Sequence, residues 1–187
     1  MAQITPTTEL EAVNYLLEAI EEEAVNTLVN AADPDVQAAR GYIQRNLRAL
    51  QVPGWEFNRE EEFKLNPNLN DEIDISPNII KVTVPGENYA IRASKLYDRK
   101  KKTYTFTEEV SAEVILLLNF EELPEAARVY VVVASAFEFQ AKRAPDELIA
   151  RLTRQDVQDA WDEFVADDMR SGNFSFSGLQ NIQNRTR

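Results

Sequence analysis

The stretch that decides the fold is residues 54–65, which read GWEFNREEEFKL. It lies where a helical pattern ends and a strand pattern begins. From Trp55 the apolar residues recur at every second position, which is typical of an extended strand. One side of this strand carries Trp55, Phe57, Phe63 and Leu65. The other side carries Glu56, Asn58, Glu60 and Glu62, and we interpret it as a solvated strand face.

Two helices are predicted before this stretch. Thr8 and Glu11 have the spacing of a capping box, and apolar residues then recur every three or four positions. A run of glutamates at 21–23 falls late in this helix, where the backbone dipole disfavours negative charge, so we expect the helix to fray or end there. Asp33 and Pro34 begin the second helix as N-cap and first residue, and Pro53 with Gly54 ends it.

Strands and then helices are predicted after the stretch. Strand-like segments lie at residues 78–84, 89–93, 95–97, 103–107 and 114–118. Residues 128–139 are ambiguous, because their β-branched and aromatic side chains favour a strand. We predict a buried helix there, since the segment begins after Pro124 and runs unbroken to Lys142. A last helix opens at residues 144–146 and stops at 171–172, with apolar contacts expected from Leu148, Leu152, Trp161, Phe164 and Met169.

The order of these elements predicts an α+β fold. Residues 1–54 and 121–172 would form a helical bundle, from which a central antiparallel β-rich domain of residues 55–120 projects. Residues 173–187 form a polar tail that has little to bury alone. We expect this tail to dock on a partner through its apolar anchors, the alternative being that they fold back onto their own helices. The anchors are Phe174, Phe176, Leu179 and Ile182.

The composition narrows the classes of function. The 187 residues include no cysteine and no histidine, which excludes thiolate and imidazole chemistry and lowers the expectation of an enzyme. The net charge of −12 repels nucleic-acid phosphate. No apolar run approaches the length of a membrane span, and no signal peptide is evident at the N-terminus.

Charged clusters supply the remaining candidates. Glu60 and Glu62 could act as a catalytic carboxylate pair, but a solvated strand face explains them better. Residues 71–74 lack the glycine and final glutamate of a calcium loop, and no phosphate-binding glycine loop exists, so we predict no metal and no cofactor. The basic cluster Arg99, Lys100, Lys101 and Lys102 falls at a predicted hairpin tip. It could contact phosphate or an acidic patch on a partner, or be an ordinary solvated turn.

Three blocks of sequence together resemble the tail tubular protein A family, the head-to-tail adaptors of short-tailed, T7-like bacteriophages. The first block is ELEAVN at residues 9–14 with Leu17, Ile20 and VNTL at 25–28. The second is Gly54-Trp55 followed by Phe57-Asn58. The third runs from LYD at 96–98 through YTF at 104–106 to FEELPEAA at 120–127. The chain departs from the family at residues 21–24, where a Gly/Pro turn is common, and after Gly172.

The resemblance implies a structural, non-enzymatic component of a podovirus virion, assembled in the host cytoplasm. In that family a dodecameric ring below the portal protein connects it to the tail nozzle protein and helps to seat tail fibres. DNA would pass through the lumen during ejection without specific binding, and acidic charge facing the lumen would keep it from adhering.

Two alternatives from other classes are kept open. The many carboxylates would suit a tail-associated glycan hydrolase that uses a carboxylate pair. The acidic composition would also suit a cellular interaction module with no role in a virion.

Overall fold

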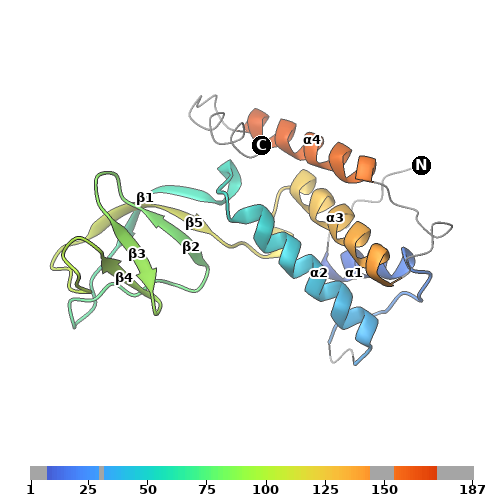
Figure 1. Ribbon diagram of the computed structural model, residues 1–187, viewed down its shortest axis with the longest axis horizontal. Coiled ribbons are helices and arrows are strands. Elements are labelled where there is room, and N and C mark those ends of the chain that lie inside the picture. Colours follow the sequence, from blue (N-terminus) through green and yellow to red (C-terminus); the bar gives the residue numbers. More distant parts are fainter. Residues whose placement is uncertain (1–7, 30–31, 144–153, 172–187) are drawn as a thin grey trace. The chain divides into compact units, whose positions relative to one another are not determined.

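The computed structural model describes residues 8–29, 32–143 and 154–171 of the chain (Figure 1). They fall into two compact units, one built from the chain up to Ile43 and from Pro124 onward, the other from residues 44–123. Helices together with antiparallel sheets confirm the predicted α+β class. The division at residues 54/55 and 120/121 stays a prediction. Among the described residues, no helix combines the length and the apolar character needed to cross a membrane.

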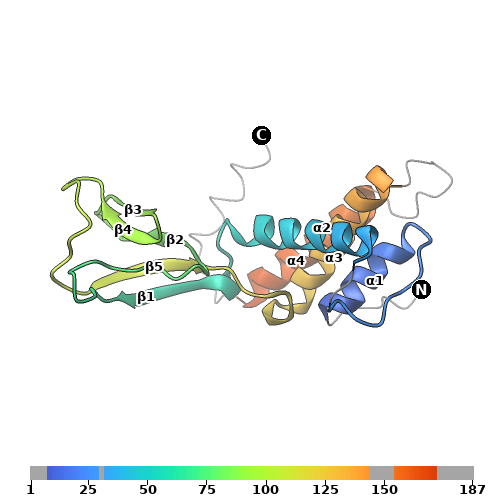
Figure 2. The same ribbon diagram turned by 90° about the horizontal axis from the view of Figure 1, so that it is seen from below.

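The first unit contains α1 (Glu9–Glu18), the start of α2 (Pro34–Gln51), α3 (Glu125–Arg143) and α4 (Arg154–Ser171) (Figure 2). The capping box of α1 is formed, because the backbone N–H of Glu11 donates to Thr8 Oγ1 at 3.2 Å and that of Thr8 donates to Glu11 Oε2 at 3.1 Å. Asp33 Oδ1 accepts from the N–H of Asp35 at 2.8 Å, which caps α2. Both predicted helix starts are therefore confirmed, and α1 ends before the glutamate run.

Helix α3 carries the core of this unit and confirms the helix predicted at residues 128–139. Phe139 is fully buried and meets Tyr42 edge-on, with ring centroids 5.7 Å apart. On α4, Trp161 and Phe164 pack against Tyr130 of α3, with ring centroids at 5.0 and 6.3 Å. The β-branched residues of α3 thus serve burial between helices rather than strand pairing.

The apolar contacts predicted for Met169, Leu148 and Leu152 of the last helix are not confirmed. The prediction for Met169 is wrong, because its side chain is 45% exposed near the end of α4. Leu148, Leu152 and the predicted helix start at 144–146 lie outside the described residues.

Tyr130 makes the stability of the helical unit sensitive to alkaline pH. Burial, with a smaller effect of Glu138, raises the pKa of Tyr130 above its ordinary value of 10.0. Because the unfolded phenol then ionises first, the free energy of unfolding is highest below pH 10 and is expected to fall as the pH rises above it. The variant Tyr130→Phe should show a shallower fall in urea denaturation between about pH 8 and pH 11. Equal slopes for variant and wild type would contradict this assignment. Burial also raises the pKa of Tyr15 and of Tyr89, so part of the fall should remain.

The second unit holds two antiparallel sheets. Strands β1 (Arg59–Leu65), β5 (Val110–Leu116) and β2 (Ile79–Thr83) pair in the order β1-β5-β2. Strands β3 (Tyr89–Arg92) and β4 (Lys95–Asp98) form a separate hairpin. The side chains buried in the core of this unit are Leu65, Ile73, Ile75, Ile79, Leu96, Phe106, Ala112 and Val114. The strand predicted at residues 103–107 is wrong, since only isolated bridges form there, from Thr103 to Asp98 and from Thr105 to Glu72.

The strand predicted from Trp55 begins four residues later. Residues 56–58 form a turn of 3₁₀ helix, and β1 starts at Arg59. Trp55 and Leu65 are buried, but Asn58 is only 1% exposed and does not belong to the predicted solvated strand face. The turn rotates Asn58 inward, so the period of two fails before Arg59.

A buried pair of amides, Gln51 and Asn58, joins the end of α2 to the sheet of this unit; we call it the amide pair. Asn58 Nδ2 donates to the carbonyls of Gln51 at 3.0 Å and Leu116 at 2.8 Å, and Asn58 Oδ1 accepts from the N–H of Trp55 at 2.8 Å. Gln51 exchanges two hydrogen bonds with the backbone of Leu118, at 3.0 and 2.8 Å. Gln51 and Asn58 are 0% and 1% exposed, and their side-chain amides are satisfied by these hydrogen bonds.

Gly54 makes the turn beside the amide pair feasible. Its φ of +83° is disfavoured for residues with a Cβ atom. A Cβ added there would lie 2.4 Å from Ile115 Cδ1 on β5. The close approach of this turn to the sheet therefore requires glycine.

Strand β1 lies at an edge of the three-stranded sheet, with β5 as its partner among the described residues. Its pairing shifts register between Glu60 and Phe63, and Glu62 has a φ of +55°. This is a β-bulge, and residues 60–62 place three exposed glutamates along it. A bulged and charged edge resists pairing with another strand.

Candidate interaction surfaces

The basic cluster forms a defined turn after β4, which we call the basic turn (residues 99–102). Asp98, 2% exposed, accepts hydrogen bonds at its Oδ1 from the N–H groups of Lys100 and Lys101, both at 2.8 Å. The N–H of Asp98 donates to the carbonyl of Thr103 at 2.9 Å and closes the turn. The buried carboxylate thus fixes the backbone, while all four basic residues are exposed.

The basic turn can contact a partner through its side chains rather than through its backbone. Asp98 already occupies two of the N–H groups that might otherwise hold an anion, so the backbone does not form a phosphate nest. Within the described residues, Arg99, Lys100, Lys101 and Lys102 form no ion pair. Exposed cations of this kind suit a salt-sensitive contact with an acidic surface.

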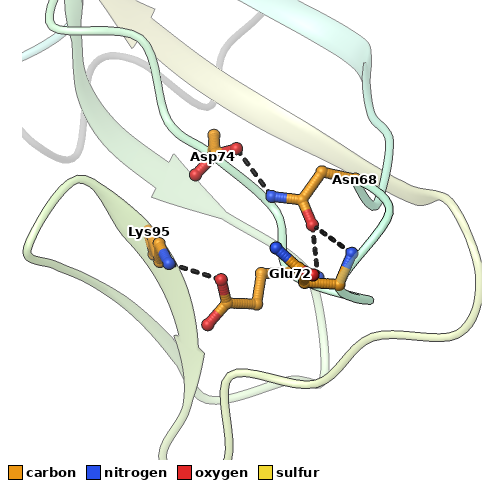
Figure 3. Close-up of polar contacts among 5 residues, drawn as sticks. Asn68, Glu72, Asp74 and Lys95 are labelled. Carbon is orange, nitrogen blue, oxygen red and sulfur yellow. Dashed lines mark hydrogen bonds and ion pairs between the residues drawn. The ribbon is translucent and has the colours of Figure 1, made fainter.

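A second surface is the loop between β1 and β2, for which we use the name Leu69 loop (residues 66–74). Asn68 organises it, as Figure 3 shows, because its Oδ1 accepts from the N–H groups of Asn70 at 2.8 Å and Glu72 at 3.2 Å. Asn68 Nδ2 donates to Asp74 Oδ2 at 2.7 Å. The carboxylate of Glu72 forms an ion pair with Lys95 on β4, and this hydrogen bond is the main reason why the pKa of Lys95 is raised.

These contacts bear on the metal and catalytic candidates. The acidic side chains of the loop are divided among separate partners, Glu72 to Lys95 and Asp74 to Asn68. The described residues contain no group of three or more acidic side chains placed to hold a metal ion. Glu60 and Glu62 are exposed residues of the β1 bulge. The predicted absence of catalysis, metal and cofactor stays a prediction.

The structure does not place all of the predicted partner-binding residues. Phe174, Phe176, Leu179 and Ile182 lie outside the described residues, so their docking role stays a prediction. The four basic residues are brought together in one turn, in the β-rich unit.

Sequence reasoning missed Leu69. The segment that contains it reads NPNLND, a composition typical of turns. Its side chain is fully exposed, at 104% of the reference area, on a loop that the contacts of Asn68 hold in place. A lone leucine among turn-forming residues was the signal available in the sequence.

Comparison with known proteins gives two matches. Residues 10–174 match the family described as tail tubular protein. Tail tubular protein A of Klebsiella phage KP34 is 34% identical over 125 residues, which are 66% of this chain and 66% of that protein. The chain thus covers just under two thirds of the length of this relative.

Proposed function

We propose that this chain, which belongs to the tail tubular protein family, forms an adaptor ring that joins the portal of a phage to the nozzle of its tail. Membership makes it a structural component of a phage tail, and hence of the virion. The family match over residues 10–174 is the observation that carries the proposal. Twelve copies in the ring, contact with tail fibres and passage of DNA during ejection belong to the same proposal.

The charge of the chain suits a conduit for DNA. At −12 per subunit, a ring of identical chains carries a large negative charge, and non-specific DNA binding depends on neutralising phosphates with cations. Acidic residues facing the lumen would therefore let DNA pass without holding it. Like charge on every subunit also opposes assembly, so apolar or oppositely charged contacts between subunits must offset it.

Partner contacts are assigned to two surfaces. The basic turn holds four cations on a backbone fixed by Asp98 and would meet an acidic patch of the portal or nozzle protein. The tail, residues 173–187, would dock on a neighbouring chain through Phe174 and Phe176.

The direct test mixes purified protein with a cognate portal ring and examines the mixture by electron microscopy. The expected result is a second ring seated on the portal, with twelve-fold symmetry. Protein that remains monomeric and leaves the portal ring bare would refute the adaptor role. A reduced yield of the complex at 0.5 M salt, compared with about 0.1 M, would agree with an ionic contact through the basic turn.

Removal of residues 173–187 is expected to weaken assembly and leave the fold intact. The described helices and sheets do not include this segment, and its phenylalanines are the assigned anchors. Circular dichroism and the unfolding midpoint should match those of the full chain, while binding to the portal ring falls at least tenfold. A truncated monomer that unfolds at a much lower temperature would show instead that the tail belongs to the core.

A further inference from the structure

The Leu69 loop presents an apolar side chain on a rigid support. Single exposed leucines are common on protein surfaces and need no partner by themselves. Here the N–H of Asn68 donates to the carbonyl of Glu72 at 2.7 Å, that of Asp71 to the carbonyl of Asn68 at 3.0 Å, and that of Phe106 to the carbonyl of Asp71 at 2.7 Å. With the side-chain contacts of Asn68 (Figure 3), these bonds fix the loop before any partner arrives. A preordered contact loses little entropy on binding.

A second exposed surface of the same unit lies at the end of α2, where an apolar side chain stands beside a basic one. Val52 is 50% exposed and stays on the last turn, since its N–H donates to the carbonyl of Arg48 at 3.2 Å. Arg48 and Ala49 are exposed beside it, and we call these three residues the α2 patch. Within the described residues, Arg48 makes no ion pair.

The charges around the two surfaces are opposite in sign. Residues 44–55, which contain the α2 patch, include Arg45 and Arg48 but no acidic residue. Residues 66–80, which contain the Leu69 loop, include Asp71, Glu72 and Asp74 but no basic residue. Glu72 is neutralised by its ion pair with Lys95 of β4, so Asp71 and Asp74 carry the negative charge of this loop. Both surfaces are exposed, so neither is covered by another part of residues 8–29, 32–143 and 154–171.

We propose that the Leu69 loop of one copy docks on the α2 patch of a second copy, with Leu69 against Val52 and Asp71 close to Arg48. The two surfaces are different parts of the chain, so the contact is head-to-tail and leaves one loop and one patch open at the ends of a pair. Such a contact can repeat from copy to copy. It closes into a ring if the rotation between neighbouring copies brings the last copy back to the first. The inference rests on the proposed ring and names a contact within it.

The first test compares Leu69→Asp with wild type in self-association, measured by sedimentation velocity over a range of protein concentrations. Replacing the apolar side chain by a carboxylate should weaken association at least tenfold. The matched control is Val29→Asp, which changes another exposed apolar residue (74% exposed) in the other unit and should associate like wild type. Equal association of Leu69→Asp and wild type would overturn the proposal.

The second test reverses the charges. Arg48→Glu and Asp71→Lys should each weaken association, and the double variant should recover most of it, because opposite charges again face each other. Asp71 has a φ of +57°, so the unfolding midpoint of each variant is measured to separate loss of fold from loss of contact. Glu87→Lys changes an exposed acidic residue elsewhere in the unit and serves as control. Additive losses in the double variant would overturn the pairing.

Failure of this inference differs from failure of the adaptor role. If wild type forms rings on the portal and all variants do the same, the contact is wrong and the adaptor role stands. If wild type neither associates with itself nor binds the portal ring, the adaptor role fails and the contact fails with it.

Discussion

Asn58→Ala is expected to lower the free energy of unfolding of the β-rich unit by about 3 kcal/mol. The substitution removes three hydrogen bonds. The N–H of Trp55 is left buried without this partner and the carbonyl of Leu116 loses a donor, whereas the carbonyl of Gln51 keeps the N–H of Gly54 at 3.1 Å. Each buried polar group deprived of its partner costs about 1–3 kcal/mol, so the loss exceeds that of an ordinary surface substitution.

Trp55 provides the measurement for Asn58→Ala. The chain has two tryptophans, so Trp161→Phe leaves Trp55 as the fluorescent reporter of the unit that contains Asn58. Urea unfolding of Asn58→Ala should then shift to a clearly lower midpoint. Asn78→Ala, at an exposed asparagine of the same unit, is the control and should shift it little. A shift of Asn58→Ala as small as that of the control would show that the amide pair adds no net stability.

Phe139→Ala is expected to destabilise the helical unit by about 3–5 kcal/mol. The side chain is fully buried in α3 and packs edge-on against Tyr42. Its removal loses apolar burial and leaves a cavity that the surrounding helices fill only in part.

The effect of Phe139→Ala is measured by thermal unfolding followed by circular dichroism at the helical signal. Trp55→Phe is not used to isolate the fluorescence of Trp161, because Trp55 is itself buried and donates its Nε1–H to the carbonyl of Leu50. Leu69→Ala removes a fully exposed apolar side chain and should leave the midpoint unchanged. A loss below about 1 kcal/mol for Phe139→Ala would mean that the site collapses without a cavity.

Local signals predicted the helices well. Thr8, Glu11 and Asp33 act within three residues of their own positions, so their caps are visible in sequence alone. The helix at 128–139 followed from its length and its proline start, although its β-branched residues favour strands. Burial between neighbouring helices outweighs the strand preference of these residues.

The errors arose where distant residues decide the conformation. Asn58 turns inward because the carbonyl of Leu116, 58 positions later, accepts its hydrogen bond, and the local alternation does not contain that partner. Thr103 and Thr105 have strand-like neighbours but find only single bridges. The exposure of Leu69 likewise depends on the contacts of Asn68 with Asp74 and of Glu72 with Lys95. These contacts form only in the folded unit, whereas the basic turn consists of four adjacent residues and is visible in the sequence.

The bulge of β1 has a consequence for how such a protein is stored before it is used. An unpaired strand edge can template ribbon-like polymers whenever many copies are crowded together. Glu62, with its φ of +55°, bends the edge, and the carboxylates of residues 60–62 repel the same edge of another copy. A pool of unassembled subunits can therefore become concentrated without growing fibres through this edge, which leaves side-chain contacts to govern which copies join.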